Sequence, residues 1–259
     1  MTSNPDARRT LEVPGIGRLI VDATNGARVE AAPGADPAEI DGLLRGSGQA
    51  WLLQLRSVLP LHLAAVAIQG RGAIGFVGPP GSGKSSLAAA LSERGWLLVT
   101  DDIAAVRWAR DGRPLLDPNP PQLRVWGDSA RQLGWDTSQQ HLLGAGGDKY
   151  AYDLPERFVP GAVPLAAIYV LNPPGAAQIG FNPIMGKQRF DVFHRGATYN
   201  ADLLDTPDAR RWHFAETLRL AQRVPAWHLT QPPGTPLAEL ADAVERHAAP
   251  KRRRSKGRR

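Results

Sequence analysis

The alternation of apolar and polar segments predicts strands and helices along most of the chain. Two apolar runs, residues 63–68 and 73–77, are joined by a Gln-Gly-Arg-Gly link. A short link that contains glycine favours a β-hairpin, so the second run is expected to lie antiparallel to the first. Residues 86–94 follow with strong helix formers and stop at Gly95. The pattern therefore predicts a hairpin that leads into a helix.

Later apolar segments predict further elements around the same core. Residues 96–100 read as a buried strand with Asp101 at its carboxyl end. The longest helix is expected at 207–223, with Thr206 or Asp208 near its start. The other expected elements are strands at 104–109 and 114–116 (a hairpin), 122–126, 163–171 and 224–229, a short helix at 128–133 that Asp128 caps, and a closing helix at 237–248. Residues 144–148 are expected to form a loop.

The first 60 residues predict a smaller unit that packs on this core. Apolar positions before Asn25-Gly26 and a return strand at 28–31 predict a hairpin. Asp36 before Pro37 is typical of a helix N-terminus, and the helix is expected to end near Gly46. We therefore expect a lead-in at residues 1–60, a main domain at 61–249 and a disordered tail at 250–259.

Composition predicts a chain that can build a sizeable core. The sequence has 259 residues, of which 42% are hydrophobic and 7% aromatic. It contains no cysteine, which excludes disulfides and thiolate metal sites. There is no run of eighteen apolar residues, and the amino end is polar without an apolar signal region. The expectation is a cytoplasmic protein without membrane insertion.

The net positive charge comes from the carboxyl-terminal tail. The chain carries +6 overall, and seven Lys and Arg lie in residues 250–259, so the rest carries +6 minus 7, or −1. A nearly neutral main domain speaks against nucleic acid as a partner. The tail has two interpretations: a solvated segment without a specific role, or one that grips an acidic peptide, RNA or membrane headgroups.

A phosphate-binding motif lies directly after the hairpin. Its residues are Gly78, Pro79, Pro80, Gly81, Ser82, Gly83, Lys84 and Ser85, with Ser86 next in the helix. Glycines let the backbone N–H groups turn towards phosphates, and the start of a helix adds partial positive charge. In such a motif the lysine reaches the β- and γ-phosphates and the serine hydroxyl binds Mg²⁺. The sequence therefore predicts a nucleoside triphosphate and Mg²⁺ as ligands.

Two adjacent carboxylates, Asp101 and Asp102, follow the next strand. Phosphoryl transfer needs a metal, cations on the transferred group and a base for the attacking hydroxyl. Asp101 is the candidate base, and Asp102 joins Ser85 as a candidate metal ligand. Neighbouring strand residues point to opposite faces, so the two carboxylates are expected to make different contacts. A simple turn or helix cap is the alternative interpretation of this pair.

Together these segments resemble a known family. The matching residues are 78–88, Arg94-Gly95 and 99–103, with further similarity at Leu61-His62, 123–126 and 147–149. They are similar to the catalytic domain of HPr kinase/phosphorylase and its relatives, which include small serine kinases found with lasso-peptide biosynthesis enzymes. The similarity covers about residues 60–170. It implies an α/β fold with a PEP-carboxykinase-like mixed β-sheet, flanking helices and the P-loop, and a catalytic domain at 61–249.

The resemblance also implies an activity. It indicates an ATP-dependent kinase that phosphorylates a serine hydroxyl of a peptide or protein, with a ribosomally made precursor such as a lasso-peptide precursor as the expected acceptor. His62 would lie near the nucleotide, and Arg124 and Lys149 would be the cations that stabilise charge. The alternatives are a structural histidine and two solvated surface side chains. The sequence leaves the oligomeric state open, a homo-oligomer included.

The chain departs from the family at one metal position. HPr kinase carries a glutamate where the nearest match here is Gln122, and an amide is a weaker Mg²⁺ ligand than a carboxylate. Either Asp102, Asp117 or Asp128 replaces that glutamate, or Ser85 and water alone hold the metal.

Other functions share parts of this pattern. A small-molecule hydroxyl kinase for free serine or a similar acceptor would need an arginine-rich lid, of which Arg107, Arg110 and Arg113 are a thin version. A P-loop ATPase or nucleotide-binding regulatory module needs only the loop and an aspartate. Residues 187–202 mix basic, aromatic and amide groups, and either line an acceptor cleft or form a polar helix face packed by aromatic rings.

Overall fold

The computed structural model describes residues 8–249 apart from 69, 120–121, 139–140, 143–147, 172–174 and 200. The strands are β1 (Arg8–Val13), β2 (Gly17–Asp22), β3 (Gly26–Ala31), β4 (Leu59–Ile68), β5 (Gly72–Val77), β6 (Leu97–Trp108), β7 (Pro114–Asp117), β8 (Gln122–Trp126), β9 (His141–Leu142), β10 (Lys149–Asp153), β11 (Val163–Leu171), β12 (Gly180–Ile184) and β13 (Ala226–Thr230). The α-helices are α1 (Pro37–Leu43), α2 (Gln49–Leu55), α3 (Lys84–Ser92), α4 (Gly127–Gln132), α5 (Gly186–Asp191), α6 (Pro207–Arg223) and α7 (Leu237–Ala248). Shorter π-helical turns lie at Leu44–Gly48 and Val192–Gly196, and 3₁₀ turns at Pro155–Arg157 and Ala201–Leu203.

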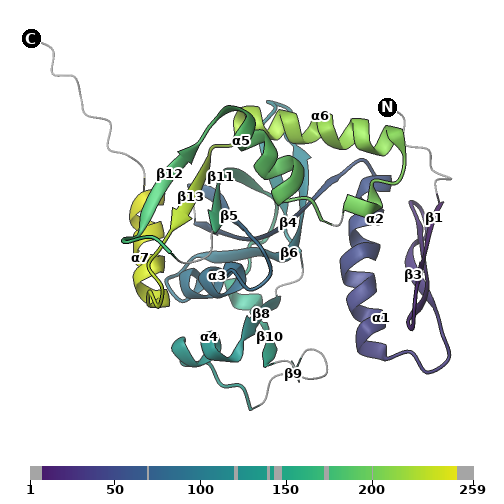
Figure 1. Ribbon diagram of the computed structural model, residues 1–259, viewed down its shortest axis with the longest axis horizontal. Helices are drawn as coiled ribbons and strands as arrows, with labels where there is room; N and C mark the ends of the chain where they lie inside the picture. The colour runs from purple at the N-terminus through teal and green to yellow at the C-terminus, as the bar shows by residue number, and fades with distance from the viewer. Residues whose placement is uncertain are drawn as a thin grey trace, which may run out of the picture.

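A seven-stranded mixed sheet forms the centre of the molecule (Figure 1). Its strand order is β12-β13-β11-β5-β4-β6-β7. β5 lies antiparallel to β4 and parallel to β11, so the expected hairpin before the phosphate-binding motif is confirmed. β7 pairs with β11 as well as with β6, so β11, β5, β4, β6 and β7 form a closed ring of paired strands. The mixed α/β class expected from the sequence is therefore observed.

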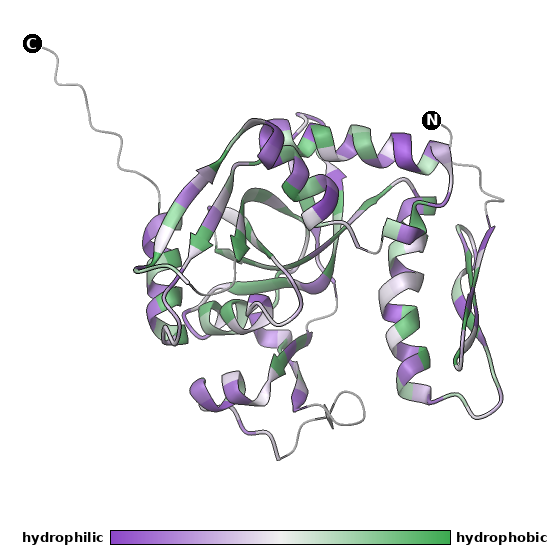
Figure 2. Cartoon of the chain, viewed as in Figure 1, coloured by the Kyte–Doolittle hydropathy of each residue, from purple (hydrophilic) through white to green (hydrophobic). Residues whose placement is uncertain are grey.

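Helices cover both faces of this sheet. On one face, Leu87 of α3 and Leu240 of α7 share a buried cluster with Phe76 of β5. On the other face, Leu220 of α6 lies in a second cluster with Ile168 of β11. The central strands are largely green in Figure 2, as expected for strands buried on both faces.

The amino-terminal unit contains more elements than the sequence predicted. β1, β2 and β3 form an antiparallel sheet, and the expected hairpin is only its β2–β3 part. The helix does not end near Gly46, because the chain continues through the π-helical turn Leu44–Gly48 into α2. The unit lies beside the central sheet (Figure 1). Trp51 of α2 anchors it there, since its indole N–H donates to the carbonyl of Leu203 at 2.9 Å.

Strand β6 corrects another expectation. The sequence predicted a strand that ends at Asp101, but β6 continues to Trp108 because its ladder with β4 runs on to the pair Leu59–Val106. Asp101 and Asp102 therefore lie in the middle of a strand. The φ of Asp102 is 117°, a conformation that side-chain-bearing residues rarely adopt, and the β4–β6 register shifts close by. The regular alternation of side chains is interrupted at this position.

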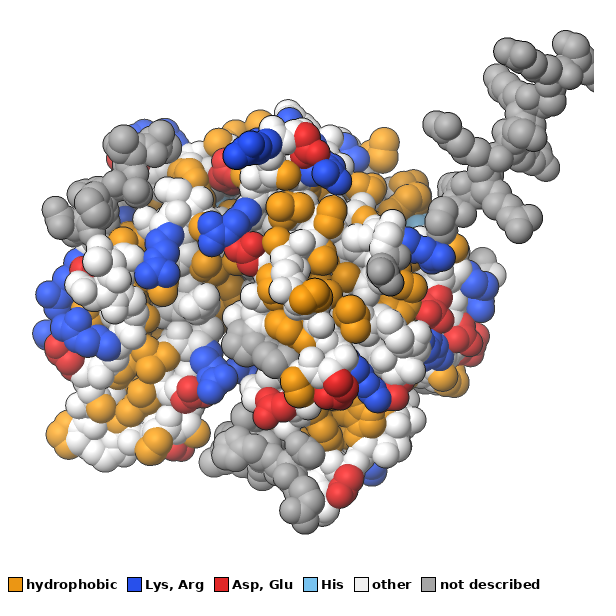
Figure 3. All heavy atoms as spheres, turned by 180° about the vertical axis from the view of Figure 1, so that it is seen from behind, with side chains coloured by type: hydrophobic (Ala, Val, Ile, Leu, Met, Phe, Trp, Pro, Cys, Tyr) orange, Lys and Arg blue, Asp and Glu red, His pale blue; other side chains and the backbone are white. Residues whose placement is uncertain are grey.

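The chain also forms a second, three-stranded sheet with the order β8-β10-β9. β8 and β10 pair antiparallel, and β9 adds to β10. On the rear face, positive and negative side chains lie interspersed (Figure 3). Across the ranges given above, no helix has the length and apolar character needed to cross a membrane. The basic tail at 250–259 and most of the loop expected at 144–148 lie outside the described residues.

Candidate functional site

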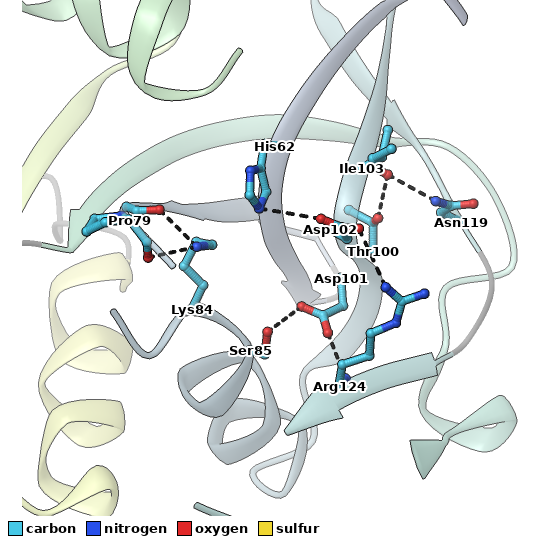
Figure 4. Close-up of polar contacts among 11 residues, drawn as sticks. His62, Pro79, Lys84, Ser85, Thr100, Asp101, Asp102, Ile103, Asn119 and Arg124 are labelled. Atoms are coloured by element: carbon cyan, nitrogen blue, oxygen red, sulfur yellow. Dashed lines mark hydrogen bonds and ion pairs between the residues drawn. The ribbon is translucent and has the colours of Figure 1, made fainter. Parts of the chain in front are cut away.

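The loop at 78–83 joins β5 to the start of α3. Gly81 and Gly83 have positive φ angles of 78° and 92°, which glycine adopts without strain. A Cβ on Gly78 would lie 2.7 Å from the carbonyl oxygen of Leu171, so only glycine fits there. The ammonium group of Lys84 donates to the carbonyl oxygens of Gly78 at 2.9 Å and Pro79 at 3.2 Å (Figure 4). The loop thus holds the lysine above the amino end of α3.

The carboxylate of Asp101 is fixed at both oxygens. The Ser85 hydroxyl donates to Oδ1 at 2.7 Å, and the backbone N–H of Arg124 donates to Oδ2 at 2.7 Å (Figure 4). Burial raises the pKa of Asp101, while these two hydrogen bonds oppose that change. Asp101 is therefore held directly beside the serine of the phosphate-binding motif.

Asp102 lies in the more open part of the site. Its Oδ1 is 3.4 Å from His62 Nε2, and its Oδ2 is 3.6 Å from a guanidinium nitrogen of Arg124. The side chain of Asp102 is 30% exposed. Burial lowers the pKa of His62, and the charge of Asp102 opposes this effect. Figure 4 shows Asp102 between the imidazole and the guanidinium.

The second sheet supplies two of the three cations. Arg124 lies on β8, and Lys149 lies opposite Trp126 in the β8–β10 pair. The ammonium group of Lys149 is 5.7 Å from the centre of the Trp126 indole. Burial lowers the pKa of Lys84, the third cation, and Asp101 and Asp102 oppose this change.

One cavity of about 260 Å³ brings the candidate residues together. All five predicted catalytic side chains line it: His62, Lys84, Asp101, Arg124 and Lys149. The predicted metal ligands Ser85 and Asp102 line it too, as do Pro80, Gly81, Gly83 and Ser86 of the motif. The hydroxyl of Ser82 is buried and has no hydrogen-bond partner in the part of the chain that the structure describes.

The sequence offered Asp102, Asp117 and Asp128 as replacements for the glutamate that HPr kinase carries, and these three carboxylates make different contacts. Within the described residues, only Asp102 of the three lines the cavity. Asp117 pairs with Arg107, and Asp128 accepts hydrogen bonds from Ser129. The amide of Gln122 donates to Asp153 at 3.1 Å.

Two residues near the site, Arg45 and Gln49, carried no sequence signal. A second cavity of about 140 Å³ shares Asp101, Asp102 and Arg124 with the first and adds Arg45 and Gln49, together with Asn119 and Gln122. The ring of Tyr199 lies 5.7 Å from that of His62. Arg45 and Gln49 are remote in sequence from the motif, and no spacing rule connects them to it, whereas Tyr199 belongs to the segment 187–202 that the sequence offered as a cleft lining.

The segment at 187–202 divides between its two interpretations. Its first part forms α5 and the turn Val192–Gly196, where Phe193 is fully buried and Phe190 stacks on His194. These contacts fit a packed helix. Tyr199, by contrast, reaches the side of the candidate site.

The oxygen donors at the head of α3 fit a magnesium ion. Ser85, Asp101 and Asp102 present hydroxyl and carboxylate oxygens, which are the ligands that Mg²⁺ prefers. Mg²⁺ commonly takes one or two protein carboxylates and completes its shell with phosphate oxygens and water. No group of three or more His, Cys, Asp or Glu suited to a metal occurs among the residues described.

The fold and the site define a mixed α/β protein with a cation- and carboxylate-lined cavity at the amino end of a helix. Neither a scan against protein-family models nor a search of curated proteins finds a match. Among solved structures, the HPr(Ser) kinase/phosphatase from Coxiella burnetii is similar at 12% sequence identity, over 73% of this chain and 95% of that chain, with a TM-score of 0.40.

Proposed function

We propose that this protein is an ATP- and Mg²⁺-dependent phosphotransferase that phosphorylates a serine hydroxyl of a peptide or protein. The observation that carries the proposal is the hydrogen bond from Ser85 to Asp101, with Asp102 beside it. It puts the serine of a phosphate-binding motif next to two carboxylates, in a cavity with three cations. Phosphoryl transfer depends on such positioning and charge neutralisation.

The nucleotide end of the site is formed by the loop and α3. The backbone N–H groups at 81–85 and Lys84 bind the β- and γ-phosphates of ATP, and Lys84 exchanges its two carbonyl partners for phosphate oxygens. Ser85 and Asp101 would hold Mg²⁺, which would supply charge neutralisation to the phosphates of the nucleotide.

The contacts favour a division of labour between the carboxylates that reverses the one expected from sequence. Both oxygens of Asp101 are engaged beside Ser85, which suits a metal-side ligand. Asp102 is partly exposed and faces His62, which suits a proton acceptor. The acceptor hydroxyl transfers its proton to Asp102 as its oxygen bonds to the γ-phosphorus and the bond to the ADP oxygen breaks. Arg124 and Lys149 stabilise the charge that develops.

The proposed acceptor follows from the sequence. A lasso-peptide precursor is the most specific candidate, and its support is the sequence resemblance alone.

Labelled ATP tests this function. The protein is incubated with γ-labelled ATP, Mg²⁺ and serine-containing peptides, and label on a peptide serine is expected. Label on free serine would select a small-molecule kinase, and phosphate release without transfer would select an ATPase. Asp102→Asn is expected to abolish transfer and retain ATP binding, whereas Asp101→Asn is expected to raise the Mg²⁺ concentration that transfer needs. Full activity of Asp102→Asn would refute its role as proton acceptor.

A further inference from the structure

The amino-terminal unit contributes a wall to the candidate site. Arg45, in the π-helical turn Leu44–Gly48, and Gln49, the first residue of α2, line the second cavity. That cavity reaches the site from the side of β6 and β8, and Asp101, Asp102 and Arg124 are common to both cavities. The carboxylate pair therefore lies where a nucleotide-side space meets a space bounded by the amino-terminal unit.

The same turn also positions Tyr199. A Cβ added to Gly46 would lie 2.2 Å from the Tyr199 hydroxyl oxygen, so the tyrosine packs directly on this glycine. Burial and the nearby charge of Asp102 raise the pKa of the Tyr199 phenol, whereas a hydrogen bond from Ser47 lowers it. The tyrosine ring lies next to His62, the partner of Asp102. The turn is thus coupled to the proton-accepting side of the site.

The charges around the second cavity are already paired. Arg45 forms an ion pair with Asp41 at 2.7 Å, and Arg124 faces Asp102. Asp101 accepts its two hydrogen bonds. Among the described residues, the remaining polar lining is made of amide side chains, which match the donors and acceptors of a neutral peptide group. Free serine would bring an ammonium and a carboxylate, and each would need a new partner of opposite charge.

We propose that the turn Leu44–Gly48 and Gln49 form the acceptor side of the active site, and that they select serine within a peptide chain over free serine. The cavity of about 140 Å³ accepts one residue of that chain. Gln49 binds a peptide group next to the acceptor, and Gly46 holds Tyr199 in place against His62. This inference rests on the phosphotransferase activity proposed above.

The test compares three single variants and one double variant. Gly46→Ala pushes a methyl group into Tyr199, and Gln49→Ala removes the proposed peptide contact. Gly42→Ala is the matched control, because an added Cβ meets nothing within 4 Å at that position. The double variant Gly46→Ala/Tyr199→Phe removes the hydroxyl oxygen that the new methyl group meets, and the next ring atom lies 3.3 Å away.

The acceptor probes are a pool of blocked pentapeptides with central serine and random flanking residues, and free L-serine. With γ-labelled ATP, kcat/KM for the peptide pool is expected to fall about tenfold in Gly46→Ala and Gln49→Ala, the effect of about one lost hydrogen bond. Nucleotide affinity, measured by calorimetry, is expected to stay the same. Gly42→Ala is expected to match the parent protein, and the double variant is expected to recover part of the loss.

Each outcome decides between the two proposals. Peptide labelling with unchanged kcat/KM in Gln49→Ala and Gly46→Ala overturns the acceptor-side inference and leaves the phosphotransferase standing. Labelling of free serine without peptide labelling overturns the acceptor-side inference and the peptide acceptor of the proposed function, and selects a small-molecule kinase instead. If the parent protein labels neither probe, the serine phosphotransferase proposal fails, and the acceptor-side inference fails with it.

Discussion

Ser85→Ala should destabilise the folded protein more than the loss of an ordinary serine hydroxyl. The Ser85 hydroxyl is one of two hydrogen-bond donors to the partly buried Asp101 carboxylate. A hydrogen bond to a charged group contributes about 1.5–3 kcal/mol, against about 0.5–1.5 kcal/mol for a neutral pair. For a chain of this size, a loss of about 1.5–3 kcal/mol corresponds to a fall in Tm of about 3–12 °C.

The loss of unfolding free energy in Ser85→Ala should grow as the pH rises. Burial raises the pKa of Asp101 above its ordinary value of 3.8, so the folded state favours the protonated carboxyl. The stability linked to this group is full below pH 3.8 and is lost as pH rises through the pKa of the folded state. Removing the Ser85 hydroxyl raises that pKa further, so the deficit of Ser85→Ala should widen from acidic to neutral pH.

Urea unfolding followed by tryptophan fluorescence measures this difference. Ser86→Ala is the matched control, because its hydroxyl contacts the neutral Ser129 hydroxyl at 2.8 Å. In an Asp101→Asn background the carboxylate charge is gone, and Ser85→Ala should then cost no more than a neutral hydrogen bond. Equal deficits for Ser85→Ala and Ser86→Ala at neutral pH, or an unchanged deficit beside Asp101→Asn, would refute this reasoning.

Three further predictions concern stability and binding. Burial lowers the pKa of His213 to about 4, so the free energy of unfolding should fall by up to about 3 kcal/mol as pH drops from 6.5 to 4. Urea unfolding measures this fall, and His213→Gln should flatten the pH dependence. Gly127→Ala places a Cβ 2.3 Å from the Asp148 carboxylate, next to Lys149, and should lower both Tm and the transfer rate. Gly161→Ala is the control: its added Cβ meets nothing within 4 Å, so Tm should not change. Lys84→Met should remove ATP binding in calorimetry without lowering Tm, because burial already disfavours the ammonium charge.

Elements with local signals could be predicted from the sequence. Helix α6 has the expected bounds, because Pro207 follows a threonine whose hydroxyl accepts from the backbone N–H of Ala209 at 3.1 Å. The β4–β5 hairpin also follows from its short glycine-containing link. In each case the information lies within a few residues of the element.

Elements that depend on distant partners could not be predicted in this way. β6 extends past Asp101 because β4, about 40 residues earlier, continues to pair with it. The first helix continues through Gly46 because the buried turn packs against Tyr199, about 150 residues later. The motif residues that line the first cavity lie close together in the sequence, while Gln49 and Arg45 reach the site only through this long-range packing.

Two effects oppose the placement of Asp101 and Asp102 side by side in one cavity. A regular strand would point Asp101 and Asp102 to opposite faces, and two neighbouring carboxylates also repel each other. The positive φ of Asp102 breaks the alternation, at a cost of about 1–3 kcal/mol for such a conformation. Arg124 offsets the repulsion through two different groups, its backbone N–H on Asp101 and its guanidinium on Asp102. One residue of β8 therefore stabilises both carboxylates, and the pairing of β8 with β10 that places it also places Lys149 in the same cavity.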